Sequence, residues 1–217
     1  MIQGFLDIRR ALPDHVGLVA VSKNRSPDDV MGLYRLGQRD FGENRVQELL
    51  TKMAVLPSDI RWHLIGHLQT NKVKYVAGKV FLIHSVDSEK LLDTLQHHLS
   101  KSGLKQDILL QVHIAQEESK YGFAPEAVPA LLRRRAPQEW PCLRIRGLMG
   151  MATLTDNKEQ VRSEFRQLSE VFGRIRKEFF SESPYFNVLS MGMSSDWPVA
   201  VEEGATLVRI GTALFAE

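Results

Sequence analysis

The chain has 217 residues, 43% of them hydrophobic and 25% charged, which is enough to bury one large core or two small ones. Its 28 Lys and Arg against 26 Asp and Glu leave a net charge of +2, which argues against nucleic acid or an anionic membrane as the partner. The only cysteine, Cys142, excludes an internal disulfide and a multi-thiolate metal site. With no leader pattern and no apolar stretch long enough to span a bilayer, we expect a cytoplasmic protein.

Short apolar runs alternate with amphipathic helical patterns along the chain. The first element is a helix over residues 1–12, ended by Pro13. The expected strands cover residues 16–23, 39–42, 60–66, 80–86, 107–114, 143–151, 187–193 and 206–211. The expected helices between them cover residues 28–37, 45–54, 71–77, a stretch that follows Ser88, 124–135, 157–180 and 196–203.

Strict alternation of strand and helix predicts a parallel sheet with helical crossovers, and thus an α/β fold. The unit repeats every roughly 24 residues, close to the repeat of a compact eightfold barrel. Eight units favour closure into a (β/α)8 TIM barrel over an open doubly wound sheet. Nothing in the composition marks a linker, so we expect a single domain over residues 1–217.

Functional groups of such barrels collect at the carboxyl ends of the strands. Lys23 ends the first expected strand, just before the sequence Asn-Arg-Ser-Pro that breaks the apolar run. Ser194 and Ser195 follow the seventh strand, and Gly211 and Thr212 lie at the end of the eighth. These two loops are the usual phosphate site of the architecture. Taken alone, each of these features has an ordinary alternative. Lys23 could be a solvated lysine at a strand end, and the serines and glycines could be residues that only form loops.

Arg209 lies between Val208 and Ile210, which are apolar. Alternation along a strand sends those two side chains toward the helices and points Arg209 into the barrel. The alternative role for Arg209 is a structural ion pair with a carboxylate of the barrel. A lysine beside a phosphate site suggests a Schiff base with a phosphorylated aldehyde.

Six motifs, in order and over nearly the whole chain, resemble those of the pyridoxal phosphate homeostasis proteins, the YggS/PROSC family. They are Ala-Val-Ser-Lys at 20–23, Phe-Gly-Glu-Asn at 41–44, Trp-His-Leu-Ile-Gly-His-Leu-Gln-Thr-Asn-Lys at 62–72, Arg-Gly-Leu-Met at 146–149, Leu-Ser-Met-Gly-Met-Ser-Ser-Asp at 189–196 and Val-Arg-Ile-Gly-Thr at 208–212. The resemblance implies a barrel like the amino-terminal domain of alanine racemase, the type III fold of pyridoxal phosphate proteins, without the carboxyl-terminal β domain.

The resemblance also implies pyridoxal 5'-phosphate (PLP) as the cofactor, held as an aldimine on Lys23. Arg209 would lie at the pyridine nitrogen. The phosphate would be contacted by Ser194, Ser195, Gly211 and Thr212, and the cofactor would be lined by Asn44 and Met149. His63 and His67 have a spacing that could suggest a metal pair, but on a strand and its exit they fit core packing and rim contact better.

An arginine at the ring nitrogen leaves that nitrogen unprotonated and weakens the ring as an electron sink. The first hypothesis is therefore a PLP-binding protein of cofactor homeostasis, without turnover and with no catalytic residue, that supplies PLP-dependent apo-enzymes. The second is a PLP-dependent amino-acid racemase or decarboxylase with Lys23 as its only base. A cofactor-free lysine aldolase is the third. With no extra domain or long apolar patch, we expect a monomer.

Overall fold

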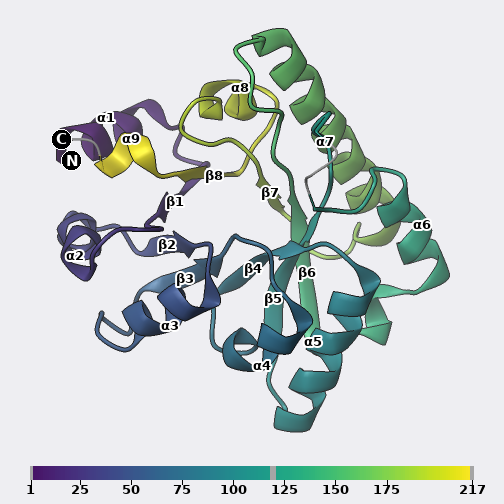
Figure 1. The fold of residues 1–217 in the computed structure, drawn as a ribbon. Helices are drawn as coiled ribbons and strands as arrows, with labels where there is room; N and C mark the ends of the chain where they lie inside the picture. Colours follow the sequence, from purple (N-terminus) through teal and green to yellow (C-terminus); the bar gives the residue numbers. More distant parts are fainter. Residues whose placement is uncertain (1, 118–120, 216–217) are drawn as a thin grey trace.

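In the computed structural model, which describes residues 2–117 and 121–215, eight parallel strands close into a barrel surrounded by helices (Figure 1). The strands follow the order of the sequence, and β8 pairs with β1. They are β1 (Gly17–Val21), β2 (Asp40–Glu43), β3 (Arg61–Leu64), β4 (Leu82–Val86), β5 (Gln106–Gln111), β6 (Leu143–Met149), β7 (Val188–Ser190) and β8 (Leu207–Ile210). The predicted barrel is confirmed.

The α-helices are α1 (Ile2–Ala11), α2 (Pro27–Arg35), α3 (Val46–Met53), α4 (Val73–Val76), α5 (Glu89–Ser102), α6 (Ala127–Arg134), α7 (Lys158–Phe179), α8 (Trp197–Glu202) and α9 (Thr212–Phe215). Two short 3₁₀ turns cover Thr70–Lys72 and Pro137–Glu139. The helix α9 was not predicted, because four residues are too few for a periodic pattern. It packs beside α1, the expected first helix, of which Met1 lies outside the described residues (Figure 1).

Several strands end earlier than predicted. The first stops at Val21, because Asn24 adopts a left-handed conformation (φ 59°) and turns the chain out of the sheet. The fifth stops at Gln111, after which Val112 forms only an isolated bridge with Phe123. The predicted helix over 71–77 is a 3₁₀ turn that continues into α4. The consequence is that Lys23 lies in a loop, two residues beyond its strand.

Side chains of alternate strand residues fill two separate layers. Leu82, Leu109 and Met149 pack together inside the barrel, whereas a larger apolar layer joins the barrel to the helices. Val208 and Ile210 belong to the outer layer. Alternation therefore sends Arg209 into the barrel, as predicted.

A bulge in β6 adjusts the register of this sheet. Ile108 pairs with Ile145 but Leu109 pairs with Gly147, so one extra residue, Arg146, is inserted in β6. Gly147 has a φ of 151°, and a Cβ there would lie 1.8 Å from the carbonyl oxygen of Val188. Only glycine fits this close approach.

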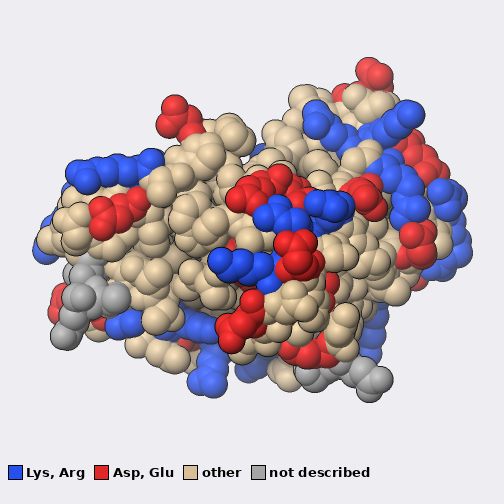
Figure 2. Space-filling model, turned by 90° about the horizontal axis from the view of Figure 1, so that it is seen from above, with Lys and Arg blue, Asp and Glu red and all other residues tan. Residues whose placement is uncertain are grey.

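The surface carries both signs of charge. Figure 2 shows basic and acidic side chains interspersed over the face it presents. The run of three arginines at the end of α6 illustrates the pairing: Arg133 contacts Glu178, and Arg134 and Arg135 both contact Glu89. No helix within the described ranges combines the length and apolar character needed to cross a membrane.

We expect Leu95→Ala to destabilise the barrel strongly. Leu95 is fully buried on the inner face of α5, and removing such a side chain costs about 2–5 kcal/mol because a cavity remains. Urea denaturation of both proteins measures the loss. His97→Ala, at an exposed position of the same helix, should change stability by less than about 0.5 kcal/mol. Equal losses in the two variants would contradict this packing.

Candidate functional site

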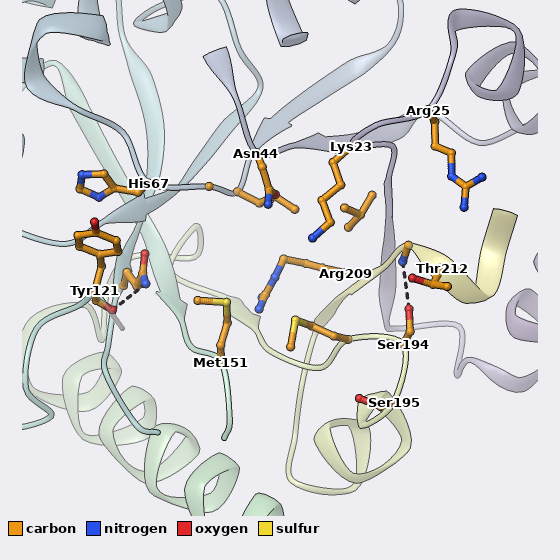
Figure 3. Close-up of a pocket in the computed structure, with 16 residues that line it drawn as sticks. Lys23, Arg25, Asn44, His67, Tyr121, Met151, Ser194, Ser195, Arg209 and Thr212 are labelled. Atoms are coloured by element: carbon orange, nitrogen blue, oxygen red, sulfur yellow. Dashed lines mark hydrogen bonds between the residues drawn. The ribbon is translucent and has the colours of Figure 1, made fainter. Parts of the chain in front are cut away.

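A cavity of about 510 Å³ opens at the carboxyl ends of the strands (Figure 3). Loops that follow β1, β2, β3, β5, β6, β7 and β8 contribute to its wall. Seven of the predicted site residues line it: Lys23, Asn44, Ser194, Ser195, Arg209, Gly211 and Thr212. The barrel therefore brings together residues that are up to 189 positions apart in the sequence (212 minus 23).

Met149 is the one predicted site residue that does not contribute to the described cavity wall. It is fully buried inside the barrel against Leu82 and Leu109. Met151, two residues further along the chain, lines the cavity instead (Figure 3). Both residues lie in the expected strand 143–151, whereas the observed strand ends at Met149, so Met151 falls in the loop that follows.

Four further polar residues line the cavity: Arg25, Gln111 and Tyr121, which were not predicted for the site, and His67, which was expected only as a rim contact. His67 stacks on Tyr121 with ring centroids 4.0 Å apart, and its Nδ1 lies 2.8 Å from the Asp87 carboxylate. Their rings occupy the side of the cavity across from Ser194 (Figure 3). Gln111 lies within the expected strand 107–114, where alternation is a usable signal, whereas Tyr121 lies in a loop with none.

The loop that carries Lys23 is held on both sides by backbone hydrogen bonds. Ser22 N–H donates to the Gly42 carbonyl (3.0 Å), and Asn24 N–H donates to Glu48 Oε1 (2.7 Å). Lys23 itself is exposed, and its side chain extends into the cavity toward Arg209 (Figure 3). The amine is thus accessible while the backbone beneath it is fixed.

A buried lysine, Lys52 of α3, connects these contacts. Its Nζ donates to the Ser22 carbonyl (2.7 Å), to Glu43 Oε1 (2.6 Å) and to Glu48 Oε1 (2.8 Å). Ser22 Oγ also donates to Glu43 Oε1 (2.6 Å). Burial raises the pKa of the Glu43 carboxyl, because desolvation disfavours its charged form. The cluster lies between the barrel and α3 and anchors the segment that presents Lys23.

Arg209 brings a buried cation to the cavity floor. Its side chain is only 4% exposed; Nη1 donates to Ser190 Oγ (2.6 Å) and Nη2 to the Gly150 carbonyl (3.0 Å). Burial lowers the pKa of Arg209 to about 10, which still leaves the guanidinium charged at neutral pH. The alternative of a direct ion pair with a barrel carboxylate is wrong, since the contacts found for Arg209 are a hydroxyl and a carbonyl.

The loops after β7 and β8 meet at one end of the cavity (Figure 3). Gly211 N–H donates to Ser194 Oγ at 3.3 Å, which joins the two loops. The Ser194 hydroxyl accepts in this bond, so its own proton remains available to a ligand. Thr212 adds a second hydroxyl beside it, and Ser195 lies one residue closer to α8.

The cavity is electropositive. Lys23, Arg25 and Arg209 line it, and none of its lining residues within the described ranges is Asp or Glu. A concave wall with charge of one sign concentrates ligands of the opposite sign. This cavity therefore favours an anionic ligand.

The two histidines of the third strand motif do not come together. His63 is buried inside the barrel, 2% exposed, whereas His67 lies at the rim, as the core-and-rim interpretation predicted. In the part of the chain that the structure describes, no three His, Cys, Asp or Glu side chains gather closely enough to hold a metal ion.

Comparison with known proteins identifies the family. The family model for the alanine racemase N-terminal domain matches residues 5–217. A relative from Aquifex aeolicus named pyridoxal phosphate homeostasis protein is 44% identical over 201 residues, which is 92% of this chain and 86% of the relative.

Solved structures agree with this assignment. PipY of Synechococcus elongatus, solved with PLP bound, superposes with a TM-score of 0.87 at 37% identity and 99% coverage of both chains. The same protein without PLP gives a TM-score of 0.92 at 38% identity and 99% coverage of both chains. An alanine racemase of Clostridium difficile shares only the fold, with a TM-score of 0.79, 12% identity and coverage of 97% of this chain and 58% of the racemase.

The fold and the cavity place this chain in the class of barrels related to the alanine racemase N-terminal domain, and within that class it belongs to the pyridoxal phosphate homeostasis family.

We expect Lys52→Met to destabilise the protein by about 3–5 kcal/mol, because it leaves the buried Glu43 carboxylate without its cation. Urea denaturation at neutral pH measures the change. Lys79→Met, at an exposed lysine, is the matched control and should lie within about 0.5 kcal/mol of the parent. A Lys52→Met protein as stable as the control would show that the cluster does not anchor the Lys23 loop.

Proposed function

We propose that this chain binds pyridoxal 5'-phosphate in the cavity at the carboxyl ends of the strands. The observation that carries the proposal is the convergence of a lysine amine, a buried arginine and two hydroxyl-bearing loops on one cavity lined by no described carboxylate. The PLP-bound structure of PipY, a relative at 37% identity, supports it.

The residues present fit this cofactor. A volume of about 510 Å³ falls within the range of small-molecule sites, and the positive wall matches a phosphate group. The Arg209 guanidinium can only donate hydrogen bonds, so it complements an unprotonated ring nitrogen. When bound, the cofactor supplies an electrophilic aldehyde and an electron-accepting ring.

Each part of the wall has its own task in this proposal. Lys23 supplies the amine that holds the aldehyde as a Schiff base, and Arg209 faces the ring nitrogen. Asn44 and Met151 line the ring, and Met149 supports the wall from beneath. The phosphate is bound by the loops after β7 and β8, through the residues Ser194, Ser195, Gly211 and Thr212.

The barrel then acts as a cytoplasmic, monomeric holder of PLP, one unit over residues 1–217, that supplies the cofactor to PLP-dependent apo-enzymes without turnover of its own. The name of the Aquifex aeolicus relative supports a homeostasis function. So does the charge at the ring nitrogen: beside an arginine the ring remains unprotonated and stabilises a carbanion less than a protonated ring does.

One observation favours an enzyme as the second candidate. His67 and Tyr121 line the cavity within this chain, and neither was among the bases expected from the sequence. Together with Lys23 they offer the proton-transferring groups that a racemase or decarboxylase requires.

We expect pyridoxal phosphate to give a coloured complex that borohydride fixes on Lys23, because reduction makes the bond to the amine permanent. Mass spectrometry of peptides locates the adduct. Lys23→Ala should abolish it, and Lys72→Ala, at another exposed lysine, should leave it unchanged.

An adduct that persists in Lys23→Ala would contradict the proposed attachment. Turnover of an amino acid that Lys23→Ala removes would instead contradict the holder and establish the enzyme.

We expect the double variant Ser194→Ala with Thr212→Val to weaken PLP binding by at least about tenfold, since hydrogen bonds to a charged group contribute roughly 1.5–3 kcal/mol each. Titration followed by absorbance measures the dissociation constant. Pyridoxal, which lacks the phosphate, is the matched ligand and should bind both proteins equally. Unchanged PLP affinity in the double variant would contradict the phosphate site.

A further inference from the structure

A row of polar side chains crosses the interior of the barrel beneath the cavity. It begins at Arg209 on β8, whose Nη1 lies 2.6 Å from Ser190 Oγ on β7. Ser190 Oγ lies 3.1 Å from Nδ1 of His84 on β4, across the barrel. His84 and Ser190 are both completely buried.

The row continues toward the amino ends of the strands. His84 Nε2 lies 2.9 Å from Nδ1 of His63 on β3, and His63 Nε2 lies 3.0 Å from Oδ1 of Asp40 on β2. Arg61 also donates to Asp40, with its Nε 2.7 Å from Oδ1. Four consecutive hydrogen bonds thus link a cation at the cavity floor to a carboxylate near the opposite end of the barrel.

The chemistry of the two ends indicates how the protons are arranged. Burial opposes ionisation of Asp40, but hydrogen bonds from His63 and Arg61 outweigh it and lower the pKa of the carboxyl. Asp40 is therefore an acceptor, and His63 Nε2 donates to it. At the other end Arg209 has only donors, so Ser190 Oγ accepts from it.

The Ser190 hydroxyl proton determines the direction of the hydrogen bond between Ser190 and His84. Its one acceptor among the contacts found for this hydroxyl is His84 Nδ1. If His84 Nδ1 carried a proton, the buried hydroxyl would keep a donor without a partner, which costs about 1–3 kcal/mol. Burial lowers the pKa of His84 well below its usual value, so the ring is neutral and carries its single proton on Nε2.

We propose that Ser190, His84 and His63 are positioning residues. They form a one-directional series of hydrogen bonds, from Arg209 to Asp40, that fixes the Arg209 guanidinium toward the cavity. This inference rests on the proposed function for its consequence: the series sets the hydrogen bond that Arg209 gives to the cofactor ring, and hence the absorption of the bound cofactor.

The dipoles in the series all point the same way. The oxygen of Ser190 faces the guanidinium, and each later acceptor faces the donor before it, down to the Asp40 carboxylate. The hydrogen bonds found for the buried Arg209 guanidinium go to a hydroxyl and a carbonyl rather than to a carboxylate, and oriented dipoles of this kind stabilise such a cation. Loss of one residue of the series would allow the Arg209 guanidinium to bind other acceptors.

The first test uses the protein without added ligand. Nitrogen-15 NMR of the histidine side chains should show His84 with its proton on Nε2. A proton on Nδ1 of His84 would overturn the proposed direction. This measurement needs no variant and does not depend on whether PLP binds.

The second test uses pyridoxal phosphate and the variant Ser190→Ala. We expect PLP still to be fixed on Lys23 by borohydride, but the absorption maximum of the complex to shift from that of the parent. Ser190→Thr restores the hydroxyl and should restore the maximum, which a loss of packing alone would not explain.

The outcomes separate the two proposals. If the parent protein does not attach PLP at Lys23, the proposed function fails, and the hydrogen-bonded series is then tested by the NMR result alone. If the parent attaches PLP and Ser190→Ala gives an identical spectrum, the positioning role is wrong while the proposed function stands.

Discussion

The pairing of β8 with β1 is the constraint on which the site depends. Val19 is paired with Arg209 and Ala20 with Ile210, so the last strand lies directly beside the first. This pairing brings Gly211 and Thr212 next to the loop that carries Lys23, and a Cβ on Gly211 would lie 3.2 Å from the Val21 carbonyl oxygen. In an open sheet the same residues would lie at opposite edges. Closure of the barrel therefore creates the cavity.

Two buried sets of charges flank this cavity, and each holds a different part of the site in place. Lys52 and Glu43 lie in the layer between the barrel and α3, where they fix the backbone next to Lys23. Arg209 lies inside the barrel, where hydroxyl and carbonyl oxygens receive its protons. Both the backbone next to Lys23 and the Arg209 guanidinium are thus held in place by buried contacts. Lys23 itself remains exposed, and the buried charges belong to its neighbours.

Local sequence patterns were enough to predict the order of the strands, the inward direction of Arg209 and most of the loops that line the cavity. Side-chain contacts between different elements were not predictable in this way. Lys52 has the pattern of an ordinary surface lysine on a helix, and its burial depends on Glu43, nine residues earlier on a strand. The contact between His84 and Ser190 joins strands that are not neighbours in the sheet. Such distances follow from the diameter of the closed barrel, which no local sequence signal encodes.

Exposure of Lys23 bears on the choice between a holder and an enzyme. A Schiff base forms and breaks with exchange of one water molecule, so an amine open to solvent permits both loading and release of a bound aldehyde. Enzymes that stabilise charged intermediates gain from excluding water at the reacting atoms. Here the buried, oriented groups surround Arg209 at the floor, and the lysine lies at the open side. That division suits a protein whose task is to retain a cofactor and give it up again.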